Sequence, residues 1–207
     1  MLFRSATAPS ELALSGKFKS TNQAMVLGRY DSANPLLGNV SLLGDTTLDT
    51  GSTASTAVLI KIGGKLDGGF DFVANSAGVT QFERAVGSLQ PLHSLQTDAL
   101  GYTDVSSSSI TAKAVGGTVS IKDPLTLSAA SIRISAGAKI EFADTVANAS
   151  GQTAALILKT ASDGTILASK DMGSDTARLG SLSILDTGSA TFIGSVDRKS
   201  TRLNSSH

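Results

Sequence analysis

The sequence predicts an all-β protein built as a parallel β-helix, a β-solenoid in which short strands stack coil upon coil. Three observations carry this prediction: a strand pattern in short segments, an internal repeat, and few aromatic residues. Short aliphatic stretches, often alternating with polar residues, occur at residues 58–62, 119–121, 132–134 and 156–158. Clusters of Gly, Ser, Asn and Asp separate them, as in strands joined by turns. Each stretch is therefore expected to be a short strand rather than part of a helix.

Internal repetition indicates how the strands are organised. The phrase Phe70-Asp71-Phe72, followed by Gly78 and Gly87, reappears 86 residues later as Leu156-Ile157-Leu158, followed by Gly164 and Gly173. Further matches at offsets of 79, 80 and 87 residues define a superrepeat of about 80–87 residues across residues 40–196. Such self-similarity is typical of repeat architectures. A β-sandwich predicts no long-range repetition, so the repeat favours a solenoid.

A finer phrase recurs inside the superrepeat. An apolar residue is followed by Gly after six positions, by Phe after four more and by Val after another four. The two matched sets lie 110 residues apart and are Phe72, Gly78, Phe82, Val86 and Leu182, Gly188, Phe192, Val196. If four coils make one superrepeat, each coil has about 20 residues. Such a coil would hold about three short strands, as in a β-solenoid.

Composition suits many thin layers better than one large core, and it excludes several classes of protein. Aromatic residues make up 4% of the chain, and Cys and Trp are absent. The core must therefore come from Val, Ile, Leu and a few Phe. The absence of cysteine excludes a disulfide scaffold and thiolate-bound metals. No apolar run approaches the roughly 18 residues that a membrane helix needs, so we predict no membrane span in this segment.

Both ends of the chain resemble translated DNA-sequencing adapter. Residues 197–207 can be back-translated into one widely used short-read adapter, and residues 1–5 into the reverse complement of its opening bases. We therefore expect residues 1–5 to be adapter-derived and residues 197–207 to be an adapter-derived, disordered tail. The natural part is then expected to be a fragment without natural caps.

Once these ends are set aside, the charge balance argues against binding to polyanions. The full chain has 17 Lys and Arg and 17 Asp and Glu, and residues 6–196 retain 13 basic and 16 acidic residues without a basic cluster. Nucleic-acid-binding proteins concentrate Lys and Arg on one face. We therefore predict no nucleic-acid partner.

The repeat is not equally clear along the chain. Residues 40–196 carry it and are expected to form the regular solenoid. Residues 6–39 fit less well and are expected to form diverged or partial coils. Within them, residues 17–19 and 25–27 are the best candidates for strands.

Five segments carry the most distinctive phrases: residues 82–88, 91–97, 140–146, 176–182 and 188–192. These phrases resemble the repeats of very large bacterial exoproteins, the filamentous-haemagglutinin-like and autotransporter-type β-strand repeat adhesins. The resemblance covers most of residues 40–196 through many weakly specific positions. It implies a right-handed parallel β-helix that is extracellular, at the surface of a Gram-negative bacterium. It also implies export by a two-partner or autotransporter route, and hence an outer-membrane transporter as a partner.

The candidate site residues lead us to predict no catalytic, cofactor-binding or metal site. His93 is the only histidine outside the adapter-like ends. A metal site with several histidines therefore cannot be assembled, and no second histidine is available for a His-Asp-Ser arrangement. We interpret His93 as a turn or outward-facing residue. Residues 63–69, which contain four Gly and Asp67, resemble a calcium turn, but such sites stack successive identical loops. Only one copy exists, so we expect no calcium.

Three aspartates that are close in sequence are the remaining candidates. Asp163, Asp171 and Asp175 could line one edge, as the carboxylates of β-helical polysaccharide lyases and hydrolases do for acid–base work. Asp is also favoured in turns, because its side chain bonds to nearby backbone. We interpret the three as solvated turn residues.

Two hypotheses for function follow, from different classes. The first is a non-catalytic structural and adhesive shaft segment of a large secreted or surface-anchored exoprotein. It would contact host-cell or matrix glycans and proteins through many weak contacts. The second is a fragment of a polysaccharide-binding or carbohydrate-active β-helix enzyme. The largest insertion between matched segments, residues 147–154, carries no ionisable group. This favours the shaft, so we predict no enzymatic activity and no cofactor.

Expression of residues 6–196 alone tests the fold and the origin of the ends. We expect a β-type circular dichroism spectrum and a tendency to form oligomers, because a solenoid without caps exposes unpaired strand edges. Removal of residues 1–5 and 197–207 should leave the β signal unchanged. A monodisperse helical monomer would contradict the fold, and loss of folding on removal of the ends would contradict their adapter origin.

Overall fold

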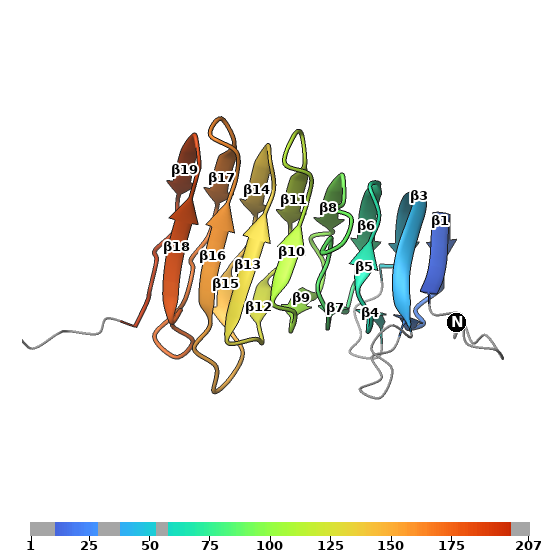
Figure 1. Ribbon diagram of the computed structural model, residues 1–207. Helices are drawn as coiled ribbons and strands as arrows, with labels where there is room; N and C mark the ends of the chain where they lie inside the picture. The colour runs from blue at the N-terminus through green and yellow to red at the C-terminus, as the bar shows by residue number, and fades with distance from the viewer. Residues whose placement is uncertain (1–10, 29–37, 53–57, 200–207) are drawn as a thin grey trace, which may run out of the picture.

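The chain forms a continuous parallel β-solenoid (Figure 1). The structure, a computed structural model, describes residues 11–28, 38–52 and 58–199. It is all-β, without a helix among these residues, and makes about 7 turns of about 24 residues each. The predicted fold class is confirmed. The coil is longer than the expected 20 residues because corner loops, such as residues 113–117 and 149–154, add residues between strands.

Each regular coil contributes strands to three faces. Face A contains β1 (Glu11–Lys19), β3 (Asn39–Asp49), β6 (Asp71–Asn75), β8 (Ser94–Thr97), β11 (Thr118–Ile121), β14 (Lys139–Phe142), β17 (Thr165–Ala168) and β19 (Ser189–Phe192). Face B contains β2 (Met25–Leu27), β4 (Leu59–Ile62), β7 (Val79–Phe82), β9 (Tyr102–Val105), β12 (Leu125–Leu127) and β15 (Val146–Asn148). Face C contains β10 (Ser109–Thr111), β13 (Ser131–Ser135), β16 (Ala155–Lys159) and β18 (Ser181–Leu185).

Isolated bridges continue face C toward the N-terminus. They run through Val86 to β5 (Leu66–Asp67), which pairs with the first part of β3. The chain passes from face A to face B to face C in each coil, as from β8 to β9 to β10. No helix in the described part of the chain is long and apolar enough to cross a membrane.

Alternation along each strand places one set of side chains in the core. In β14, for example, Ile140 and Phe142 are buried, while Lys139 and Glu141 face outward. Parallel pairing keeps this alternation in register, so that buried residues stack from coil to coil. One such ladder, the face-C ladder, runs through Leu12, Val40, Leu66, Val86, Ile110, Ile134, Leu158 and Ile184.

A second ladder runs along face A. Its members are Phe18, Leu48, Ala74, Thr97, Ile121, Phe142, Ala168 and Phe192. The two ladders and their counterparts on face B enclose one core that is continuous along the rod. Burial of the apolar side chains in this core is the main favourable contribution to folding.

Matched segments of the internal sequence repeat lie on different faces of the solenoid. Ile60 matches Ile140 in the repeat, yet Ile60 faces inward from face B and Ile140 from face A. Similarly, Phe72 lies on face A and its match Leu182 on face C. The offset between matched segments is therefore not a whole number of coils. Similar strand-and-turn phrases can serve different faces, because every face needs the same inward alternation.

The two ends of the chain differ in part from expectation. Of residues 6–39, the strands β1 and β2 pair with β3 and β4, whereas residues 6–10 and 29–37 lie outside the described residues, as do residues 1–5 and 200–207. Residues 197–199, the start of the tail that was expected to be disordered, lie against the preceding coil. The amide of Asp197 donates to Met172, and that of Lys199 donates to Leu179. The edge of a sheet presents unpaired amide and carbonyl groups, so it can pair with the backbone of the segment that follows, whatever the side chains of that segment are.

Gly87 tests how closely the coils approach each other at a corner. Its φ is +66°, and an added Cβ would lie 2.0 Å from the carbonyl oxygen of Thr111 in the next coil. Gly116 has a similar φ of +71° but has no atom within 4 Å of an added Cβ. We expect Gly116→Ala to lower the free energy of unfolding by about 1 kcal/mol, the cost of the left-handed backbone alone. Gly87→Ala should cost at least about 3 kcal/mol, because the coils must also separate.

Urea unfolding followed by circular dichroism measures both values. Equal losses of stability in the two variants would contradict the close approach at Gly87.

Candidate functional site

A histidine, a serine and an aspartate meet on face A, but not in the order that catalysis needs. His93 Nδ1 lies 2.6 Å from Asp71 Oδ1, and the hydroxyl of Ser94 donates to the same oxygen at 2.7 Å. An activated serine must instead donate to the histidine, with the carboxylate behind the ring. Here the carboxylate is the shared acceptor, so the arrangement activates no nucleophile. The side chain of His93 is 52% exposed, which confirms the prediction that it faces outward.

Asp71 holds neighbouring coils together. Partial burial raises the pKa of Asp71, but hydrogen bonds from Ser94 and His93, together with the nearby charges of His93 and Lys113, hold the pKa below its ordinary value. Its own backbone amide donates to Asp45 of the preceding coil at 3.0 Å. The carboxylate therefore belongs to a chain of contacts that crosses three successive coils.

The glycine-rich segment 63–69 is a pair of tight corners rather than a calcium turn. Asp67 is 7% exposed, and its Oδ1 accepts the backbone amides of Leu89 and Gln90 at 2.7 and 3.2 Å. An added Cβ on Gly64 would lie 2.0 Å from the carbonyl oxygen of Gly38. The glycines thus allow close approach of adjacent coils, and the carboxylate fixes the next corner.

The structure does not bring Asp163, Asp171 and Asp175 together. Asp163 lies at the corner between β16 on face C and β17 on face A. Asp171 lies where face A passes to face B, and Asp175 lies beyond the face-B bridge of Met172, on the way to β18. The three carboxylates thus occupy three different corners of one coil. The geometry of a paired acid and base on one edge is not formed by these residues.

Asp171 repeats the role of Asp71. Its Oδ1 accepts the backbone amide and the hydroxyl of Ser195, one coil later, at 2.7 and 3.0 Å. These two hydrogen bonds lower the pKa of Asp171. The interpretation of Asp171 as a turn residue fits this contact, but its carboxylate is bound by the next coil rather than only solvated.

Asp123 is the most deeply buried carboxyl in the described residues. It is 1% exposed and accepts hydrogen bonds from the hydroxyls of Thr97 and Thr103, both at 2.8 Å. Burial raises the pKa of Asp123 to about 6, against the lowering effect of the two threonines, and the neighbouring Asp98 raises it further. Because the carboxyl is enclosed, it cannot reach a substrate. It serves as an internal acceptor at the corner between faces A and B.

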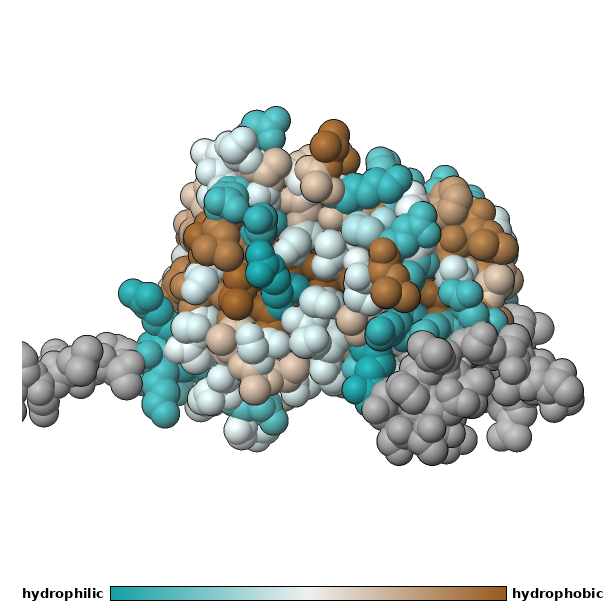
Figure 2. Space-filling model, in the orientation of Figure 1, coloured by the Kyte–Doolittle hydropathy of each residue, from teal (hydrophilic) through white to brown (hydrophobic). Residues whose placement is uncertain are grey.

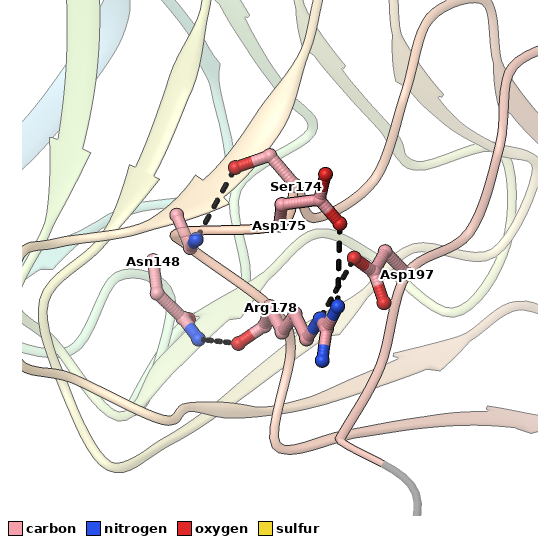
Figure 3. A network of polar contacts seen from close by, with 6 residues as sticks. Asn148, Ser174, Asp175, Arg178 and Asp197 are labelled. Carbon is pink, nitrogen blue, oxygen red and sulfur yellow. Dashed lines mark hydrogen bonds and ion pairs between the residues drawn. The ribbon is translucent and has the colours of Figure 1, made fainter.

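A polar network marks the place where face B becomes irregular (Figure 3). Asn148, 5% exposed, accepts the amide of Ala154 and donates to the backbone carbonyl of Arg178. The guanidinium of Arg178 donates to Asp175 at 3.2 Å and to Asp197 at 3.0 Å, and these contacts raise its pKa. Asn148 thus fixes the loop of residues 149–154 against the corner of residues 174–178.

One pattern joins these groups. The side chains of Asp67, Asp71, Asp123 and Asp171 bond to residues 20–26 positions away, which is about one coil. Among the described residues, no group of three or more His, Asp or Glu is placed to hold a metal ion. The candidate residues are therefore distributed along the rod, several of them as ties between coils, and do not converge on one point.

Sequence reasoning missed the ties at Asp123 and Asn148. A Thr and an Asp 26 residues apart carry no local motif, and their contact becomes visible only when the chain is divided into coils. The tie at Asp67 was missed for the same reason, since its glycine neighbours directed attention to calcium.

Comparison with models of protein families, with curated proteins and with solved structures found no match to this chain.

Replacement of Asp123 tests its burial through the pH dependence of stability. Its pKa is about 6 in the folded protein and about 3.9 in an unfolded chain, so the folded state binds the proton more tightly. The stabilisation that the protonated Asp123 carboxyl contributes is fully present below about pH 4. It is lost as the pH rises through about 6, where the folded protein must bury the charged form. We expect Asp123→Asn, which keeps an acceptor for both threonines, to stabilise the protein at pH 7.5 by up to about 3 kcal/mol. It should have little effect at pH 4.

Thermal unfolding at both pH values measures this difference. Asp163→Asn, in an exposed corner, is the matched control and should change little at either pH. An Asp123→Asn protein that is less stable than the parent at pH 7.5 would contradict the cost of the buried charge.

Proposed function

We propose that this chain is a non-catalytic structural and adhesive shaft segment of a large bacterial surface exoprotein. The observation that carries the proposal is that the candidate catalytic residues do not converge on one point, and that Asp71 and Asp171 bond to the next coil, along a core that is continuous through the described part of the chain. Polar groups that tie one coil to the next stiffen the rod. At roughly 4.8 Å for each coil, about 7 turns set the two ends roughly 30 Å apart.

Exposed apolar side chains at one corner support the adhesive part of the proposal. Leu43, Phe70, Leu89 and Val115 are 66%, 38%, 75% and 88% exposed. All four lie where face C passes to face A, one in each of four successive coils. We call this row the C–A ridge. Weak contacts repeated once for each coil add up when many copies are displayed together.

The resemblance to filamentous-haemagglutinin-like exoproteins supports the cellular setting of the proposal. It favours an extracellular location at the outer membrane and export through an outer-membrane transporter. The contacts would then be with glycans or proteins of a host cell or matrix.

Adhesion of protein-coated beads tests the proposal. We expect binding of the beads to cultured epithelial cells and to matrix proteins to rise steeply with the density of the coating, while a single soluble chain is washed away. The double variant Leu89→Ser, Val115→Ser should reduce bead adhesion by about tenfold or more, since each copy loses part of its contact.

The control variant carries Leu100→Ser and Ile193→Ser, which remove apolar side chains that are 47% and 69% exposed at the corner between faces A and B. It should adhere like the parent protein. Adhesion that does not depend on density, or equal losses in both variants, would contradict contact through the C–A ridge. Release of products from a panel of bacterial and host polysaccharides would instead support the enzyme alternative.

A further inference from the structure

The buried Asp123 is followed by Pro124, and no other aspartate of the chain precedes a proline. The two residues form the corner between β11 on face A and β12 on face B, in the middle of the stack (Figure 1). Figure 2 shows hydrophilic residues spread over the outside of the rod, whereas Asp123 is 1% exposed. An enclosed carboxyl meets no external substrate, but its own backbone carbonyl belongs to the same residue.

An Asp-Pro peptide bond can be broken by the aspartate itself. The protonated side-chain carboxyl attacks the backbone carbonyl carbon of the same residue, and a five-membered cyclic anhydride forms as the C–N bond breaks. The carboxyl proton ends on the proline nitrogen, which leaves as a secondary amine. Water then opens the anhydride, so the net change is hydrolysis of one peptide bond. Because the attacking and attacked atoms belong to one residue, the reaction is intramolecular.

Two threonines of the preceding coil hold both the carboxyl and the backbone beside this bond. The hydroxyls of Thr97 and Thr103 donate to Asp123 Oδ1, both at 2.8 Å. The same hydroxyl of Thr97 accepts the amide of Lys122 at 3.1 Å, and the amide of Thr103 donates to the carbonyl of Pro124 at 2.9 Å. The residues on either side of the bond are therefore fixed to the groups that hold the carboxyl.

The surroundings of Asp123 favour the protonated carboxyl, which is the reactive form. Asp98 lies in the preceding coil, Asp144 lies in the next coil, and Lys122 precedes Asp123 in the chain. Burial, and less strongly the charge of Asp98, raise the pKa of Asp123 to about 6 against the hydrogen bonds of the threonines. Much of the carboxyl is therefore protonated in mildly acidic solution, where an ordinary aspartate is charged.

From this arrangement we propose that the folded chain cleaves itself between Asp123 and Pro124, with the Asp123 carboxyl as the attacking group. The reaction consumes one water and needs no other reactant. It happens once in each chain and does not depend on the adhesive part of the proposed function.

The rod stays in one piece after the cut. The pairings of β9 with β12, β10 with β13 and β11 with β14 join the part before the cut to the part after it. Both parts also share the continuous core. The cut thus converts one chain into two chains that separate only when the coils unfold or are pulled apart.

Mass spectrometry of the full chain after incubation for days at pH 5.5 and at pH 8 tests the proposal. We expect fragments 1–123 and 124–207 to accumulate at pH 5.5 and hardly at all at pH 8, because the protonated carboxyl is lost as the pH rises through about 6. Gel filtration without denaturant should still give a single peak, whereas a denaturing gel should show two bands. A chain that stays intact at pH 5.5 would overturn the proposal.

A parallel incubation in urea separates cleavage that the fold promotes from the general lability of Asp-Pro bonds. The pKa of an aspartate in an unfolded chain is about 3.9, so at pH 5.5 its protonated fraction is about 30 times smaller than that of Asp123 in the folded protein. We expect cleavage in urea to be slower by about tenfold or more. Cleavage that is equally fast or faster in urea would show that the fold does not promote it, contrary to the proposal.

Two variants each remove one part of the reaction. Asp123→Asn removes the attacking carboxyl, and Pro124→Ala removes the basic leaving nitrogen. Each should slow cleavage at pH 5.5 by about tenfold or more, and circular dichroism checks that each variant folds. Cleavage at the parent rate in either folded variant would rule out the mechanism.

The next coil offers a matched control within the same chain. Asp144 is the register partner of Asp123 but is partly exposed. Thr145→Pro therefore places a second Asp-Pro bond at the equivalent corner, where Pro124 already shows that proline fits. At pH 5.5 the bond after Asp123 should break faster than the bond after Asp144. Equal rates at the two bonds would contradict a role for the enclosed site.

Discussion

Parallel backbone pairing between successive coils is the constraint on which the rest of this structure depends. Once Leu59 pairs with Val79 and Lys139 with Thr165, the alternation of the strands fixes which side chains enter the core. It also fixes which of them stack into ladders. The polar side chains then act at the corners, where the backbone leaves the ladder. Asp67 accepts two amides of the next corner, and Asp171 binds Ser195 in the same manner.

Much of the fold was predictable because strand alternation and corner residues are local. The stretches at residues 119–121, 132–134 and 156–158 are parts of strands as expected. The length of a coil was harder to predict, since a matched phrase such as Ile60 and Ile140 lies on two different faces. Sequence similarity indicates that two segments adopt the same local structure. It does not indicate how many corners of the solenoid separate them.

The candidate site was less predictable, and for a physical reason. Whether an aspartate is a solvated turn residue or a buried acceptor depends on what the adjacent coil places above it. Asp163 is exposed, as a turn aspartate is expected to be. Asp123 resembles it in sequence but is enclosed by Thr97 and Thr103 from two strands. The spacing that creates this contact, 20 to 26 residues, varies with the length of the corner loops. Only the three-dimensional register decides it.

The placement of matched phrases on different faces has a further consequence for how such a rod diversifies. Duplication of one strand-and-turn phrase preserves the core, because all three faces accept the same inward pattern. It also rotates every later residue by one third of a turn around the axis. A row of surface side chains such as the C–A ridge would then break at the duplication and resume on another side. Small slips in copying could therefore wind a surface pattern helically around the rod without disturbing its interior.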